Sequence, residues 1–128
     1  MSVYDVAVIG SGPGGYVAAI RCSQLGLKTA LIEKYSTLGG TCLNVGCIPS
    51  KSLLDSSHHY EDATKHFSEH GMEIEGSITL NFKQMIDRKA AVVEQTTKGI
   101  DYLMQKNKID VFEGLGSFVD ATHIKIDG

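Results

Sequence analysis

The sequence predicts an α/β fold with a parallel sheet, helices on both faces of the sheet, and the start of a β-hairpin or meander. Two observations support this prediction. A short apolar strand is followed by a glycine-rich turn, a helix and a second strand, which is the order of a right-handed parallel crossover unit. The 14 glycines are concentrated toward the N-terminus, with eight of them in the first fifty residues. A chain of 128 residues is one domain or a part of one.

The first crossover unit is predicted to end at Glu33. Val3–Ile9 is almost entirely apolar and rich in β-branched residues, as expected of a strand that is buried on both faces. Tyr16–Leu25 contains good helix formers and stops before Gly26, which is a typical residue at a helix C-terminus. Lys28–Glu33 then forms the second strand.

The rest of the chain is predicted to contain two long helices and further strands. Pro49 is placed in the first turn of one helix, and apolar residues recur at broadly helical spacing in the other. The expected elements are, in order, a glycine-rich loop at Ser36–Gly46, a helix from Cys47 to about His70, a loop at Gly71–Leu80, a helix at Asn81–Gln105, a strand at Ile109–Glu113, a break at Gly114–Gly116, and a hairpin of Phe118-Val119 and Thr122–Ile126 around Asp120-Ala121.

We expect the domain to be incomplete. A doubly wound sheet in the order 3-2-1-4-5-6 places its fourth strand beside the first. Only three parallel strands are predicted here, so the first strand would be left as an apolar edge. Residues 1–128 are therefore interpreted as the N-terminal portion of a longer dinucleotide-binding domain.

Composition excludes several classes of function. Lys and Arg number 12 against 15 Asp and Glu, a net charge of −3, and no basic stripe indicates a nucleic-acid partner. No apolar run approaches the length of a membrane span, and the N-terminus does not resemble a secretory signal. Three cysteines do not make a secreted disulfide framework, so we expect a reducing compartment, the bacterial cytoplasm or an organelle that holds a processed form.

The segment Gly10–Gly15 matches the dinucleotide-binding pattern G-x-G-x-x-G. Its first glycine allows a tight turn, its second lets the backbone approach a pyrophosphate, and its third lets the helix pack on the strand. The phosphates would lie at the helix N-terminus, where free N–H groups and the helix dipole favour negative charge. The predicted binding residues of this segment are Gly10, Ser11, Gly12, Pro13, Gly14 and Gly15.

Glu33 is the predicted partner of a ribose. It ends the second strand, 18 positions after Gly15, where the ribose-binding carboxylate of this motif belongs. An acid at this position disfavours a ligand with a 2′-phosphate.

A second motif, G-G-T-C-L-N-V-G-C-I-P-S-K, spans Gly39–Lys51. Cys42 and Cys47 are too far apart in a regular helix to form a disulfide, so a bridge would require a distorted turn. The intervening residues Asn44–Gly46 tolerate such a turn. Cys47 would open the next helix, where the helix dipole stabilises a thiolate. A stabilised thiolate beside a second thiol is a redox device.

The two motifs together imply FAD. Disulfides exchange electrons with other thiols, nicotinamide carries a hydride, and a flavin is the usual intermediary between them. The ADP half would occupy Gly10–Gly15 and Glu33, and the flavin ring would lie over Cys47.

These segments closely resemble the pyridine nucleotide–disulfide oxidoreductases, along essentially the whole chain. Within that family, Cys47-Ile48-Pro49-Ser50-Lys51 is most similar to the dihydrolipoamide dehydrogenases. Glutathione reductases read C-I/V-P-K-K at this point, and mercuric reductases usually have V-P-S-K. Glutathione or mercuric ion therefore stays as an alternative substrate, and a catalytically inactive FAD-binding module as an alternative function.

The resemblance implies a role for each residue of the second motif. Cys47 resembles the thiol that contacts the flavin, Cys42 the interchange thiol that attacks the dithiol substrate, and Lys51 the lysine beside the flavin N5 edge. The further cofactor-binding residues that it implies, beside the glycine motif, are Glu33, Lys34, Gly39, Gly40, Thr41, Cys42, Lys51 and Gly116.

The resemblance also implies a longer protein. Family members add an NAD domain, the remainder of the FAD site and a dimerisation domain, whose His–Glu pair acts on the partner subunit. The expected whole protein is a homodimer that oxidises dihydrolipoamide on lipoyl domains of 2-oxo acid dehydrogenase complexes or the glycine cleavage system. It would reduce NAD⁺ as co-substrate. These 128 residues alone would be inactive.

Other reactive side chains are interpreted as structural. Cys22 lies mid-helix and is expected to be a small packing residue. Histidines 58, 59, 66 and 70 alternate with charged residues, which indicates a solvated helix face. No metal site is predicted.

Overall fold

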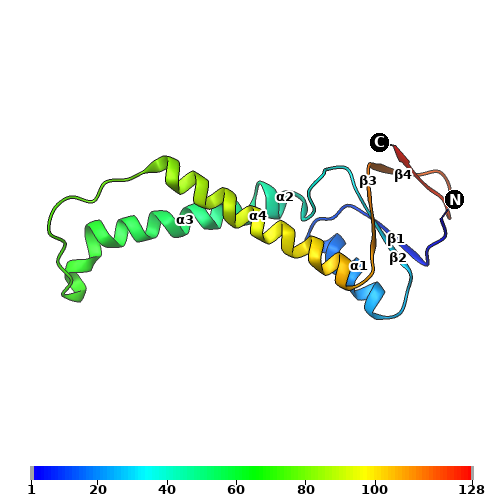
Figure 1. Cartoon of the computed structure of the whole chain (residues 1–128), viewed down its shortest axis with the longest axis horizontal. Coiled ribbons are helices and arrows are strands. Elements are labelled where there is room, and N and C mark those ends of the chain that lie inside the picture. Colours follow the sequence, from blue (N-terminus) through cyan, green and yellow to red (C-terminus); the bar gives the residue numbers. More distant parts are fainter. Residues whose placement is uncertain (1, 128) are drawn as a thin grey trace.

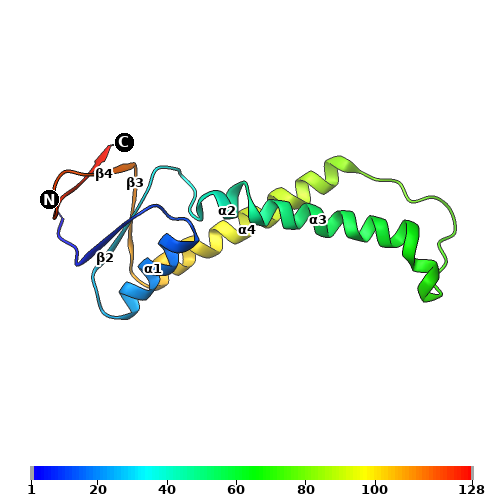
Figure 2. The same cartoon turned by 180° about the vertical axis from the view of Figure 1, so that it is seen from behind.

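The computed structural model describes residues 2–127 and contains a small parallel sheet from which a long pair of helices extends (Figures 1 and 2). The sheet has the order β1 (Val6–Ile9), β2 (Thr29–Glu33) and β3 (Asp110–Glu113), with all strands parallel. Val8 pairs with Leu31, which pairs with Val111. The predicted parallel sheet is confirmed, and within the described residues β1 pairs only with β2 and forms an edge.

Both sheet-covering helices, α1 (Pro13–Gln24) and α4 (Phe82–Lys106), lie on one face. Leu31 is fully buried on that face, in a core with Ala19 of α1 and Met104 of α4. The expectation of helices on both faces is therefore wrong for the described residues. The strand order advances from β1 to β3 in one direction, and two right-handed crossovers that advance in the same direction place both helices on the same side.

The other face of the sheet is approached by an antiparallel hairpin of β4 (Leu115–Phe118) and β5 (Ile124–Asp127). A side-chain carbon at Gly116 would lie 3.1 Å from Ile32 of β2, so the hairpin packs closely on the sheet there. The predicted hairpin exists, but the predicted break at Gly114–Gly116 is shorter than expected. Gly114 alone turns the chain, and β4 begins at Leu115.

A helical arm extends from the sheet (Figure 1). It consists of α3 (Cys47–Glu61), which packs against the N-terminal part of α4, with a loop joining them at the far end. Asn81 caps α4 through a hydrogen bond from the N–H of Gln84 to its side-chain oxygen. No helix of the described residues is long and apolar enough to cross a membrane.

Several elements differ from prediction, among them α1, which begins at Pro13 and not at Tyr16. β1 begins at Val6, because β2 begins at Thr29 and offers no partner to Val3. A short helix, α2 (Gly40–Asn44), lies in the predicted loop, where the Asn44 amide donates to two backbone carbonyls. The helix predicted to reach His70 changes after Glu61 into a π turn (62–66) and a 3₁₀ turn (67–70). The Thr64 hydroxyl donates to the Tyr60 carbonyl there, which competes with regular helix bonding.

Candidate functional site

A cleft of about 340 Å³ lies at the carboxyl ends of β1 and β2. This is the edge of a parallel α/β sheet at which ligands bind. Eight of the predicted site residues line it: Gly10, Ser11, Gly12, Glu33, Lys34, Gly40, Thr41 and Gly116. The cleft therefore collects residues from both sequence motifs and from β4.

The glycine loop is shaped for a ligand as well as for the fold. A Cβ at Gly15 would lie 1.8 Å from the Gly10 carbonyl oxygen, so the packing of helix on strand requires this glycine. A Cβ at Gly12 would meet no protein atom within 4 Å, although Gly12 lines the cleft. The described chain therefore leaves room for a side chain at position 12, and the glycine keeps the backbone open toward the cleft. This position fits a backbone that must let a pyrophosphate approach.

The N-terminus of α1 directly follows Gly12. No side chain caps this end among the described residues, and Pro13 lacks an N–H. The following N–H groups of a helix have no partner in the helix itself, so they can donate to an anion. Pro13, Gly14 and Gly15 do not line the cleft, and they form the first turn of α1.

Glu33 is buried at the end of β2, 6% exposed. Its Oε2 accepts hydrogen bonds from the Ser11 N–H at 2.8 Å and the Ser11 hydroxyl at 2.6 Å, and its Oε1 accepts the Tyr35 N–H at 3.1 Å. Burial alone would raise the pKa of this carboxyl. The hydrogen bonds from Ser11 and Tyr35 outweigh burial and lower the pKa below its ordinary value, so Glu33 is an anion at neutral pH.

The second motif lies directly against the first. Gly40 opens α2 with a φ of +60°, and a Cβ there would come within 2.8 Å of the Gly12 Cα. Only glycine fits this close approach. Thr41 follows in the cleft lining, and Gly39 donates its N–H to Ser11. Gly40 and Thr41 of the second motif therefore continue the wall of the cleft that the glycine loop begins.

The two cysteines follow on successive helices. Cys42 lies within α2 and Cys47 is the first residue of α3, as predicted, with a tight turn between them closed by a 2.7 Å hydrogen bond from the Gly46 N–H to the Thr41 carbonyl. Both are free thiols, Cys47 exposed and Cys42 half-buried. A Cβ at Gly46 would lie 3.0 Å from the Thr41 oxygen, which explains the glycine between the cysteines.

The cysteines act on each other electrostatically. The hydrogen bond that Cys42 shares with the Cys47 side chain raises the pKa of Cys42, and burial and the charge of Cys47 act in the same direction. Lys51, one helical turn after Cys47, acts in the opposite direction. Cys42 therefore keeps its proton to higher pH than an isolated cysteine, and the pair holds a single negative charge more readily than two.

Several cleft residues were not predicted from the sequence. They are Ile9, Ile32, Tyr35, Gly114 and Leu115. Ile9 and Ile32 are neighbours at the ends of paired strands, a position that the strand assignment itself could have identified. Lys34 lies over the Tyr35 ring, 4.8 Å from its centre, so these two residues form one wall of the cleft. The predicted residues Cys42, Cys47 and Lys51 lie outside the cleft lining.

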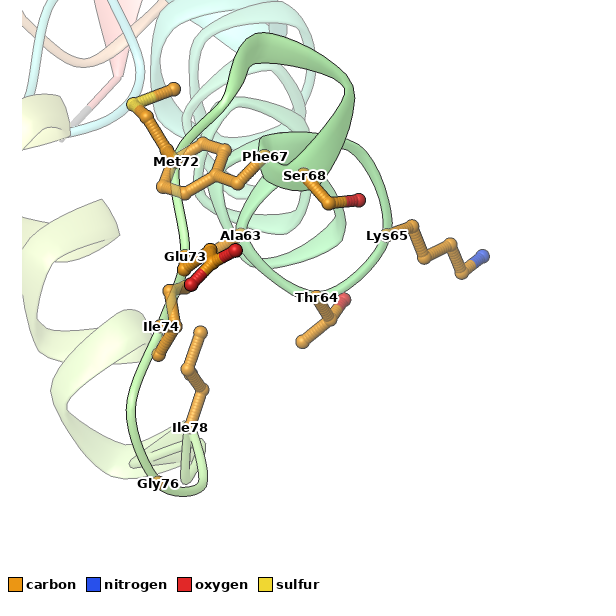
Figure 3. A pocket seen from close by; sticks show the side chains of 10 residues that line it. All are labelled: Ala63, Thr64, Lys65, Phe67, Ser68, Met72, Glu73, Ile74, Gly76 and Ile78. Carbon is orange, nitrogen blue, oxygen red and sulfur yellow. The ribbon is translucent and has the colours of Figure 1, made fainter.

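A larger cavity, about 520 Å³, lies elsewhere. It is at the far end of the arm, between the π and 3₁₀ turns and the following loop (Figure 3). Phe67, Met72, Ile74 and Ile78 contribute its apolar lining, and none of the predicted site residues reaches it. Within residues 2–127 no group of three or more His, Cys, Asp or Glu side chains is placed to hold a metal.

A glycine-rich cleft at the carboxyl ends of parallel strands, followed in the chain by two thiols, is the arrangement expected of a dinucleotide-binding oxidoreductase domain. Residues 4–127 match the family described as pyridine nucleotide-disulphide oxidoreductase, and the chain belongs to this family of enzymes.

Individual relatives agree with this membership. The chain is 51% identical over 125 residues to the mitochondrial dihydrolipoyl dehydrogenase of Schizosaccharomyces pombe, which covers 98% of the chain and 24% of the relative. It is 48% identical to the dihydrolipoyl dehydrogenase of Trypanosoma brucei brucei (98% and 26% covered) and 54% identical to leghemoglobin reductase of Vigna unguiculata (96% and 23%). The chain thus spans about a quarter of the length of these curated relatives.

A solved structure has the same fold. The Cu(II) complex of the HOCl-induced flavoprotein disulfide reductase RclA from Escherichia coli superposes with a TM-score of 0.76 at 28% identity. The match covers 100% of this chain and 25% of that one. The partial Rossmann-like architecture is therefore that of a flavoprotein disulfide reductase.

Proposed function

We propose that the chain is the N-terminal portion of the FAD-binding domain of a dihydrolipoyl dehydrogenase. The single observation that carries this proposal is the contact between the two motifs. Gly40, two residues before Cys42, lies so close to the glycine loop that a Cβ on Gly40 would come within 2.8 Å of the Gly12 Cα. A dinucleotide on the glycine loop would therefore extend toward the cysteine pair.

The residues of the cleft divide the work of holding FAD. Gly10, Gly12 and the N-terminus of α1 would hold the pyrophosphate, and Glu33 would accept the ribose hydroxyls. Lys34, Gly39, Gly40, Thr41 and Gly116 are proposed to line the remainder of the cofactor site. FAD, when bound, supplies a two-electron carrier between a dithiol and NAD⁺.

The cysteine pair performs the thiol chemistry. The cycle begins with the cysteine pair oxidised to a Cys42–Cys47 disulfide. A thiolate of dihydrolipoamide attacks the sulfur of Cys42, the Cys42–Cys47 bond breaks, and Cys47 is left as a thiolate. The second substrate thiol, after losing its proton, attacks the substrate sulfur that is bound to Cys42. Lipoamide leaves as a cyclic disulfide, and Cys42 leaves as a thiolate that takes up a proton. The reduced pair now holds the two electrons, with Cys42 as a thiol and Cys47 as a thiolate. The raised pKa of Cys42 favours this distribution of the single proton.

The whole protein is proposed to work as a homodimer with an NAD domain and a dimerisation domain. The partner would be a lipoyl domain of a 2-oxo acid dehydrogenase complex or of the glycine cleavage system. Relatives include mitochondrial proteins, which supports an organelle as the proposed compartment.

The first test uses flavin as its own reporter. The chain is incubated with FAD and passed through gel filtration, and the visible spectrum is recorded across the protein peak. Co-eluting flavin, and a long-wavelength band after dihydrolipoamide is added, are the expected result. Protein without flavin would contradict a self-sufficient FAD cleft in these 128 residues.

The substrate is tested separately in the whole protein. Cys42→Ser should abolish oxidation of dihydrolipoamide with NAD⁺ while flavin stays bound. Glutathione and mercuric ion, the alternative substrates, are assayed with the parent protein. A preference for either of them, or full dihydrolipoamide oxidation by Cys42→Ser, would contradict the assignment.

A further inference from the structure

Ser11 stands at a position that the glycine motif leaves unspecified, yet it is completely buried, 0% exposed. A hydroxyl in such a place is costly unless it is hydrogen-bonded. Its Oγ donates to Glu33 Oε2 at 2.6 Å and accepts the Gly39 N–H at 3.1 Å. Both functions of the hydroxyl are therefore used within the protein.

The two partners belong to different parts of the site. Glu33 is the carboxylate at the end of β2, 22 positions from Ser11, and Gly39 is the residue before α2, 28 positions away. The Ser11 backbone strengthens both links, because its N–H also donates to Glu33 and its carbonyl also accepts from Gly39. Ser11 thus connects the Glu33 carboxylate, through hydrogen bonds, to the start of the helix that carries Cys42.

We propose that Ser11 is a positioning residue that fixes the Glu33 carboxylate for the dinucleotide ribose and, through Gly39, fixes the start of the cysteine-bearing helix α2. This inference rests on the proposed function. Ser11 donates two hydrogen bonds to Oε2, and Oε1 accepts the Tyr35 N–H. A carboxylate has about four lone-pair positions, so acceptor capacity remains for a ribose hydroxyl. The Ser11 side chain acts on the protein and not on the cofactor.

The decisive variant is Ser11→Ala, with Ser11→Gly as a second form in case the first fails to fold. Both keep the backbone links; Ser11→Ala removes only the hydroxyl, and Ser11→Gly removes the whole side chain. Ser23→Ala is the matched control, because Ser23 also donates a partly buried hydroxyl, from α1 to the Asn107 carbonyl, away from the cleft.

The first readout is the pKa of Glu33 in the chain without cofactor, followed by carboxyl ¹³C NMR. Hydrogen bonds from Ser11 hold this pKa below 4.5, so removing the hydroxyl should raise it toward 4.5. A lowered pKa contributes stability above the unfolded value, and this stability is lost as pH falls through the folded value. The variant should therefore lose less stability on acidification than the parent, whereas Ser23→Ala should keep the parent profile.

The second readout is the alkylation rate of Cys42 by iodoacetamide, resolved by peptide mass spectrometry. Freeing Gly39 from the hydroxyl should change this rate by about threefold or more, the effect of one typical net hydrogen bond. The third readout is flavin retention during acidification. As the pH is lowered, Ser11→Ala should release flavin at a higher pH than the parent does.

An unchanged Glu33 pKa together with an unchanged Cys42 rate, relative to Ser23→Ala, would overturn the inference. If only the Glu33 pKa or only the Cys42 alkylation rate changes, Ser11 does not position both the carboxylate and α2, and the proposed double role is overturned. If the unsubstituted whole protein binds no FAD, the proposed function fails. The first two readouts still decide the role of Ser11, because neither requires the cofactor.

Discussion

At the scale of single residues, glycines of one motif serve different purposes, and substitution should separate them. Gly15 is required by the fold, since its Cβ would overlap the Gly10 carbonyl, whereas Gly12 faces only open space. Gly15→Ala should destabilise the chain by about 1–3 kcal/mol through forced backbone shifts. Gly12→Ala should cost less than about 1 kcal/mol, as an N-cap change, yet abolish flavin retention.

Urea unfolding and co-elution with FAD measure these two effects independently. Pro13 keeps α1 starting at the same place in both variants, so the comparison concerns the two glycines alone. Normal flavin retention by Gly12→Ala would mean that no ligand approaches the backbone there.

The sequence indicated many of the residues that line the cleft, but not the hydrogen bonds that join them. Gly10, Gly12 and Glu33 follow from a motif whose chemistry is known, and the structure brings them into one cleft. The role of Ser11 could not be predicted, because the motif allows any residue there and its partners are more than 20 positions away. Local patterns indicate residue type and local conformation, whereas side-chain partners depend on how distant segments meet.

At the scale of elements, one ion pair distinguishes the arm. Arg88 of α4 donates to Asp55 of α3 at 3.0 Å, and also to the hydroxyl and carbonyl of Ser52 at 3.1 and 3.4 Å. All other ion pairs among the described residues join positions at most four apart. Arg88 therefore fixes α3, whose first turns carry Cys47 and Lys51, against α4.

Arg88→Ala should destabilise the chain by about 1–2 kcal/mol, since it removes charged hydrogen bonds and leaves the buried Ser52 hydroxyl without this donor. Lys98→Ala is the control, because it breaks an exposed pair within α4 that is worth less than about 1 kcal/mol. Hydrogen exchange should increase in the α3 amides of the first variant only. Equal exchange in both would show that apolar packing alone holds the arm.

The order of the main strands and helices along the chain was predictable from the sequence, whereas their placement in space was not. The glycine-turn signals correctly separated β1, α1 and β2, because they act over a few residues. The short helix α2 was missed, since its stability comes from the Asn44 amide and from contact with the glycine loop, not from helical periodicity. The face on which α1 and α4 lie follows from strand order, which no local pattern contains.

At the scale of the whole molecule, the sheet is open at β1. Within the described residues Val6–Ile9 pair only with β2, so one row of backbone hydrogen-bonding groups has no strand partner in the sheet. An exposed apolar edge is a template for pairing with a second chain. The sheet face beside β1 also offers apolar surface to a second chain. A cavity of about 360 Å³ between the sheet and the hairpin is lined there by Ala7, Ile32 and Phe112, among others.

The 128-residue chain by itself should therefore self-associate in a concentration-dependent way, as measured by light scattering after gel filtration. Ala7→Lys places a charge on the open strand and should shift the chain toward the monomer, because a lysine on an edge strand opposes pairing. Ala18→Lys makes the same change on the exposed surface of α1 and should leave association unaltered. If the parent chain is a monodisperse monomer at high concentration, the β1 edge does not drive association. If both lysine variants dissociate the oligomer equally, net charge and not the edge controls it.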